Sequence, residues 1–388
     1  MTLEQAIRQG EARLSAGPHP DRARRDAESL LLHVIRRNRA GMLARWNEVL
    51  EASESQTLKG LIERRLAGEP IQYIVGQTEF YGLPFRVTPD VLIPRPETEH
   101  LVEEALRVAA RFPSPRIVDV GTGSGAIAVA LAHQLTKQAD PDLKVHSFTH
   151  AASEAPVLKG HSFTHAAREA TVSKGHGFTH VAREATVSKG HGFTHAASEA
   201  PVSKGHGFTR AASEASVLKG HGFSRADKAN TTNGALAPEG PSFSVTAIDI
   251  APQALALAEQ NANRNGAAIR FLVGDLLTPV AGETFDLILS NPPYVPLIDR
   301  STLSVEVREF EPSLALFAGD DGLSIYRRLI PAAHAVLVPG GFLLLEIGYG
   351  QQQPIQELLA ASSFTGIHFI PDLQNIPRVA CAEKASCG

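Results

Sequence analysis

The chain has 388 residues, of which 43% are hydrophobic, and a formal net charge of −4. This length suits two or three domains, and the charge lacks the basic excess of proteins that hold nucleic acid by bulk electrostatics. Its two cysteines, Cys381 and Cys387, exclude a disulfide framework and a cysteine-based zinc site. No apolar run reaches the roughly 18 residues of a membrane span. We therefore expect a cytoplasmic protein without direct nucleic-acid or membrane partners, and we expect it to be a monomer.

Residues 1–75 are predicted to form a helical domain that docks a protein substrate. Apolar residues recur there at helical spacing, and Pro18, Pro20, Gly41 and Gly68 separate the segments. The segment has 12 Lys and Arg against 10 Asp and Glu, which indicates solvated helix faces rather than an RNA-binding surface.

Residues 76–100 are predicted to form a hairpin and a linker. Phe80, Phe85 and Val87, with Gly82 and Pro84 between them, favour the hairpin. The run Ile93-Pro-Arg-Pro-Glu-Thr-Glu99 then predicts a rigid extended linker in which Pro96 begins a helix. Its arginine and first glutamate could cover a pocket, but helix capping and surface pairing explain them equally well.

A glycine turn follows the first predicted parallel strand, Arg116-Ile-Val-Asp-Val120. Glycines there allow a ligand to approach the backbone closely at the start of the next helix. The spacing Gly-x-Gly-x-Gly differs from the Gly-x-Gly-x-x-Gly of dinucleotide enzymes and favours S-adenosylmethionine. The candidate cofactor-binding residues of this turn are Asp119, Gly121, Thr122, Gly123, Ser124 and Gly125.

A 15-residue repeat then interrupts the pattern, with Lys144, Lys159, Lys174, Lys189, Lys204 and Lys219 each heading one copy. Few residues per copy can be buried, so we expect a disordered insert over residues 146–244. Ten of the sixteen histidines lie in it, some paired at i, i+4 as a divalent metal would require. Gly177 and Gly192 oppose a helix at these pairs, and we assign no metal site.

The flanks of the repeat look like two halves of one strand, Pro141–Val145 and Val245–Asp249. Removing residues 146 to 245 shortens the separation of Gly125 and Asp249 from 124 positions to 24, which is the usual distance to an acid that binds ribose hydroxyls. We therefore predict a methyltransferase domain in two parts, 101–145 and 245–388. The insert should leave from the amino end of the second strand, away from the ligand.

The pattern after Asp249 is that of a doubly wound, Rossmann-like α/β sheet. A helix begins at Ala251-Pro252, and Asp275 and Leu276 follow a third strand, 269–273, where a carboxylate could hold the adenine amino group. The remaining predicted elements are a helix over 323–338, a strand over 341–347 and an antiparallel hairpin of 367–370 with 379–382.

The fourth strand leads into the predicted reaction site, in the run Phe285-Asp-Leu-Ile-Leu-Ser-Asn-Pro-Pro-Tyr294. Two prolines make this loop stiff and leave carbonyl groups free. An amide, backbone carbonyls and an aromatic ring suit a planar –NH2 group, although a simple Pro-Pro turn is an equal alternative. Asn291, Pro292 and Tyr294 are the candidate catalytic residues; Asn291, Pro292, Pro293 and Tyr294 would bind substrate, and Asn291 would also contact the cofactor.

From Pro70 to Gly350, without the insert, the chain resembles the bacterial release-factor glutamine methyltransferases, the HemK family. The matching runs are Ile93-Pro-Arg-Pro-Glu-Thr-Glu99, Val118-Asp-Val-Gly-Thr-Gly-Ser-Gly125, Asn291-Pro-Pro-Tyr294, Glu311-Pro-Ser-Leu-Ala-Leu-Phe-Ala-Gly319 with Asp321-Gly-Leu323, and Gly341 to Gly348. The resemblance implies methyl transfer from S-adenosylmethionine to N5 of the glutamine in the Gly-Gly-Gln motif of peptide-chain release factors. The repeat is foreign to the family, and Leu276 stands where some members carry an aromatic residue.

Three other functions remain open at this point. An Asn-Pro-Pro-Tyr loop also serves enzymes that methylate the exocyclic amine of adenine, although no basic target-recognition domain is evident. A methyltransferase acting on a glutamine of a large-subunit ribosomal protein would use the same chemistry. In a non-catalytic protein, the insert would have broken the second strand and with it the cofactor site.

Overall fold

The structure, a computed structural model, describes residues 1–139 and 243–386. The repeat, its histidine pairs and the expected strand lead-in 141–145 therefore lie outside the described residues. Within the described ranges, no helix is both long enough and apolar enough to span a bilayer.

The N-terminal residues form helices, as predicted. Thr2 begins the first of them with a capping box, in which its hydroxyl accepts from the Gln5 amide and its own amide donates to the Gln5 side chain. Leu30 and Leu31 are completely buried in the apolar core that these helices share. The helices are α1 (Leu3–Leu14), η1 (Pro20–Arg22), α2 (Ala23–Ile35), α3 (Arg39–Leu43), α4 (Ala52–Leu66) and α5 (Ile71–Val75).

The hairpin and the linker helix are also confirmed. Strands β1 (Gln77–Phe80) and β2 (Leu83–Arg86) pair antiparallel. A 3-10 turn, η2 (Pro96–Thr98), then leads into α6 (Glu99–Ala109).

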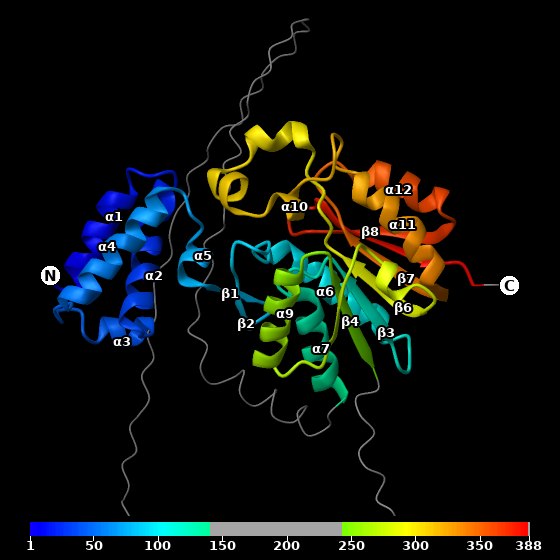
Figure 1. The fold of residues 1–388 in the computed structure, drawn as a ribbon, viewed down its shortest axis with the longest axis horizontal. Helices are drawn as coiled ribbons and strands as arrows, with labels where there is room; N and C mark the ends of the chain where they lie inside the picture. Colours follow the sequence, from blue (N-terminus) through cyan, green and yellow to red (C-terminus); the bar gives the residue numbers. More distant parts are fainter. Residues whose placement is uncertain (140–242, 387–388) are drawn as a thin grey trace, which may run out of the picture. The chain divides into compact units, whose positions relative to one another are not determined.

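A seven-stranded sheet forms the centre of the remaining chain (Figure 1). Its order is β5-β4-β3-β6-β7-β9-β8, with the first five strands parallel and the last two antiparallel. The strands are β3 (Arg116–Val120), β4 (Ser244–Asp249), β5 (Arg270–Val273), β6 (Phe285–Ser290), β7 (Leu337–Glu346), β8 (Phe364–Pro371) and β9 (Pro377–Lys384). The direction of strand addition reverses between β3 and β6, and ligands bind beside such reversals in open α/β sheets.

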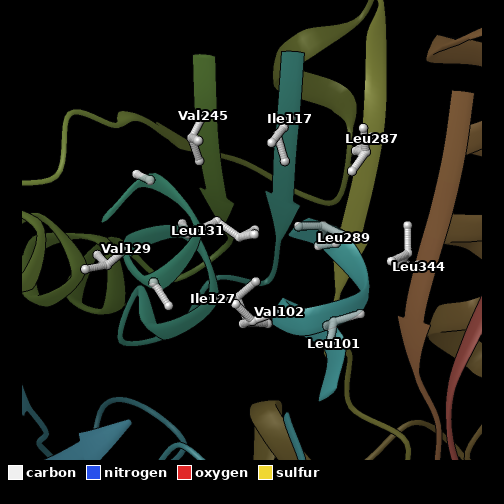
Figure 2. Packing of buried hydrophobic residues seen from close by; sticks show 14 of the residues in the cluster. Leu101, Val102, Ile117, Ile127, Val129, Leu131, Val245, Leu287, Leu289 and Leu344 are labelled. Atoms are coloured by element: carbon white, nitrogen blue, oxygen red, sulfur yellow. The ribbon is translucent and has the colours of Figure 1, made fainter. Parts of the chain in front are cut away.

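Helices cover both faces of this sheet because its parallel strands are apolar on both sides. Ile117 faces a core shared with α6, α7 (Ala126–Ala139) and α9 (Pro252–Arg264), part of which Figure 2 shows. The next residue, Val118, faces the opposite core with α11 (Ser324–Val336) and α12 (Gln352–Ala361). The doubly wound sheet predicted from the sequence is therefore confirmed.

The strand that follows the repeat in the sequence, β4, is fully formed. β4 begins at Ser244, one residue before the predicted start, and pairs with β3 from Ser244 to Ile248 and with β5 from Thr246 to Asp249. Ser244 lies at the amino end of the sheet, as expected for the point where the insert rejoins it. The non-catalytic alternative required a broken second strand, and this strand is formed.

Candidate functional site

A cavity of about 390 Å³ opens at the carboxyl edge of the parallel strands. This size is typical of small-molecule sites. Nine predicted site residues line it together, and they come from the ends of β3, β4, β5 and β6: Gly121, Thr122, Gly123, Ser124, Asp249, Asp275, Leu276, Asn291 and Pro293. The glycine turn and the Asn-Pro-Pro loop thus share one cavity.

The glycine turn is held by backbone bonds at its base. The amides of Gly121 and Thr122 both donate to the Ile248 carbonyl, at 2.8 and 3.0 Å. Gly123 has a φ of 55°, and a Cβ added there would meet no atom within 4 Å, so the backbone faces open space. This arrangement leaves room for a ligand against the main chain.

Two predicted residues of this region support the turn from outside the cavity lining. Asp119 is completely buried, and its carboxylate accepts a 2.6 Å hydrogen bond from the Thr122 hydroxyl. Burial raises the pKa of Asp119 to about 7, although the Thr122 bond opposes the shift. At Gly125 a Cβ would lie 3.0 Å from the Cβ of Ala258, so glycine permits the close contact with α9.

The acids after β4 and β5 both line the cavity but have different partners. Asp249 accepts from the amide of Gly123 at 2.8 Å and from that of Ala251 at 2.9 Å. It therefore ties the glycine turn to the start of α9. Asp275 instead forms an ion pair with Arg328 of α11, which also lines the cavity.

Asn291 is held by a buried chain of hydrogen bonds. Its Nδ2 donates to the Thr98 hydroxyl at 3.1 Å, and that hydroxyl donates to Oε2 of Glu346 at 2.6 Å. Tyr294 donates to the other oxygen of Glu346 at 3.3 Å. Within the described residues no donor reaches Oδ1 of Asn291, so this oxygen is available to a ligand in the cavity.

Pro292 and Tyr294 do not line the cavity, unlike their neighbours Asn291 and Pro293. Pro292 is buried, and the Tyr294 hydroxyl reaches towards Glu346. The Tyr294 carbonyl accepts a 3.0 Å bond from Gln351, which also accepts from the Gly348 amide. The loop is therefore fixed at both of its ends, and its tyrosine points away from the expected substrate position.

Two distant runs singled out in the sequence meet beside this loop. Arg95 lines the cavity and donates to both carboxylate oxygens of Glu311, at 2.6 and 2.8 Å. Glu311 is buried, which raises its pKa, while the adjacent guanidinium opposes the shift. The pair holds Pro312 and Ala315 at the cavity wall.

Comparison with known proteins identifies the family. The family model described as "PrmC N-terminal domain" matches residues 5–76, and "Methyltransferase small domain" matches residues 233–306. A "Release factor glutamine methyltransferase" of Koribacter versatilis is 32% identical over 99% of this chain and 99% of its own. The chain belongs to the release factor glutamine methyltransferase family.

A second relative agrees with this assignment. The protein of the same description from Geobacter sulfurreducens is 31% identical and covers 92% of this chain and 89% of its own. A solved protein-(glutamine-N5) methyltransferase from Alicyclobacillus acidocaldarius is 23% identical, covers 78% of this chain and 99% of its own, and has a TM-score of 0.32. The assignment rests on the sequence relatives.

Three residues of the site were not predicted from the sequence: Thr98, Arg328 and Glu346. Thr98 lay in a run interpreted as a linker and the start of a helix, and Arg328 in the predicted helix 323–338, to which no site residue was assigned. Glu346 had a usable signal, because it ends a parallel strand as Asp249 does, and side chains at that edge face the ligand crevice.

Glu346 should make stability depend on pH. Burial raises its pKa from 4.5 to about 7, so the folded state binds this proton more tightly than the unfolded state does. Its contribution to stability is full below about pH 4.5 and is lost as the pH rises through 7, by up to about 3 kcal/mol. Glu346→Gln should therefore gain stability relative to the parent protein between pH 5 and pH 8.

Urea denaturation of both proteins at the two pH values measures this change. Glu357→Gln, at an exposed position of α12, is the matched control and should show a pH-independent difference. A stability difference between parent and Glu346→Gln that is the same at pH 5 and pH 8 would contradict the prediction.

Proposed function

We propose that this protein transfers a methyl group from S-adenosylmethionine to N5 of the glutamine in the Gly-Gly-Gln motif of peptide-chain release factors. The observation that carries the proposal is the single cavity shared by the glycine turn, Asp249 and the free Oδ1 of Asn291. Family membership supports the same activity.

The cavity fits S-adenosylmethionine in its chemistry. The exposed backbone at Gly121 and Gly123 suits the aminocarboxypropyl tail, and Asp249 can accept from ribose hydroxyls with its remaining lone pairs. Leu276 offers an apolar wall for the adenine, and Asp275 an acceptor for its amino group. When bound, the cofactor supplies an electrophilic methyl carbon on a sulfonium.

The residues of the Asn-Pro-Pro loop then orient the substrate. A carboxamide nitrogen is a poor nucleophile because its lone pair is delocalised, so catalysis depends on position and fixed dipoles. Asn291 Oδ1 would accept one N–H group of the substrate amide. Pro292 lies outside the cavity lining, but its carbonyl, which no donor of the described residues reaches, would accept the other. Held in this way, the nitrogen would bond to the methyl carbon, the bonding electrons of the sulfur–carbon bond would remain on the departing sulfur, and one N–H proton would pass to solvent.

The other assignments follow from this arrangement. Pro293, which lines the cavity, would form the wall beside the amide plane, and Tyr294 would hold the loop through its hydrogen bond to Glu346. The helical domain, residues 1–75, would dock the release factor, since a site for one glutamine side chain cannot by itself select a large protein. No step of the proposed reaction uses a metal ion.

Labelled methyl transfer to three acceptors tests the function. The full chain with labelled S-adenosylmethionine is expected to modify an intact release factor and to leave the same factor unmodified when its Gly-Gly-Gln motif is changed to Gly-Gly-Ala. Label in adenine of DNA would show a nucleic-acid methyltransferase. Label only in a large-subunit ribosomal protein would move the substrate assignment to that protein.

A further inference from the structure

We propose that Thr98 and Glu346 are positioning residues that fix which way the Asn291 amide faces, so that its oxygen and not its NH2 group meets the substrate. This inference rests on the proposed function, because only an –NH2 substrate needs an acceptor at this place. Neither residue lies in the Asn-Pro-Pro-Tyr run, and Glu346 does not line the cavity.

The direction of the hydrogen bonds follows from the proton count. Above its pKa of about 7, Glu346 is ionised and only accepts, so Oε2, 2.6 Å from the Thr98 hydroxyl, takes the single proton of that hydroxyl. The threonine oxygen then has only lone pairs to offer to Asn291. At 3.1 Å, it can bind Nδ2 and not Oδ1.

A reversed Asn291 amide would place two acceptors against each other. Thr98 is 4% exposed and Glu346 2%, so water cannot easily supply the missing proton. Leaving such a buried pair unsatisfied disfavours the reversed amide by roughly 5- to 150-fold. The reversed amide would also present its NH2 group to the substrate NH2 group, where two donors meet.

Groups around Glu346 keep its oxygens in place. Tyr294 donates to Oε1 at 3.3 Å. The charge of Arg378 in β9 favours the ionised carboxylate, whereas the charge of Glu97 in η2 disfavours it. The carboxylate belongs to the last residue of β7, which pairs with Val379 of β9. The acceptor that sets the direction of the Asn291 amide is therefore a residue of the sheet, and the hydrogen bonds to it orient the loop that carries Asn291.

Two substitutions of Thr98 distinguish the effect of losing its hydrogen bond from the effect of changing the size of its side chain. Valine has the shape of threonine without the hydroxyl, whereas serine keeps the hydroxyl. Thr98→Val should lower kcat for release-factor methylation roughly 10- to 100-fold, with less than about a threefold change in the dissociation constant for S-adenosylmethionine. Thr98→Ser should retain kcat within about threefold. Thr246→Val, a buried threonine of β4 outside this chain of bonds, should behave like the parent.

A second measurement does not depend on activity. In protein labelled with ¹⁵N-asparagine, one Asn291 side-chain proton should exchange slowly in the parent and in Thr98→Ser, and fast in Thr98→Val. The inference would be overturned if Thr98→Val had the same kcat as the parent, or if Thr98→Val and Thr98→Ser lost kcat equally. It would also be overturned if the Asn291 side-chain proton exchanged at the same rate with and without the Thr98 hydroxyl. A parent protein that fails to methylate release factor but shows the protected proton would instead refute the proposed function alone.

Discussion

Replacing Asn291 with alanine is expected to reduce methyl transfer to the release-factor glutamine by roughly 100- to 1,000-fold, the loss seen when a fixed polar group is removed from a reacting centre. The substitution removes Oδ1, the side-chain atom placed to accept from the amide, while the backbone of the loop stays anchored through Gln351. The loss should appear in kcat, measured with saturating S-adenosylmethionine and release factor.

The control for this substitution is Asn263→Ala, on an exposed turn of α9. It should leave both kcat and KM unchanged. Methyl transfer by Asn291→Ala at a rate within about threefold of the parent would remove Asn291 from the mechanism, and with it the reason for the Thr98 and Glu346 arrangement.

Replacing Asp249 with alanine is expected to weaken S-adenosylmethionine binding by about 100-fold or more. Hydrogen bonds to a charged acceptor contribute about 1.5–3 kcal/mol each, and the ribose would lose two. The substitution also releases the Gly123 amide, which donates to Asp249 at 2.8 Å, so the glycine turn loses a support. Calorimetric titration with S-adenosylmethionine measures the change.

Two further variants make this result specific. Asp249→Asn keeps one acceptor oxygen and should bind with intermediate affinity. Asp320→Ala, at an exposed position outside the cavity lining, should bind like the parent. An unchanged dissociation constant in Asp249→Ala would show that the ribose is held elsewhere.

The parts of the site that could be predicted are those encoded locally. The glycine turn follows a short strand rich in apolar residues, Asp249 is the last residue of its strand, and Asn291 directly follows its strand. The hydrophobic pattern and the residues that end each strand therefore identify them. Parallel strands place such ends at one edge of a sheet. Thus Gly123 and Asn291 could be placed together without coordinates.

The parts that could not be predicted depend on contacts between distant residues. Thr98 and Glu346 are 248 positions apart, and no local pattern relates a linker hydroxyl to a strand-end acid. The Tyr294 ring was expected to pack against the substrate amide. In the structure its hydroxyl donates to Glu346. The direction of a side chain after two prolines depends on such a distant partner, which the local sequence does not reveal. Asp275 was interpreted as an acceptor for the adenine amino group, and its ion pair with Arg328 of α11 could not be predicted from the local sequence.

The entry point of β4 has a consequence for how this protein can vary. Ser244 and Asp249 are at opposite ends of the strand, roughly 16 Å apart at about 3.3 Å per residue, and only Asp249 lies at the cavity. Gain or loss of whole 15-residue units between Ala139 and Ser244 changes the chain at the edge remote from chemistry. A change in the number of repeat units therefore enters the fold at the end of β4 opposite to Asp249.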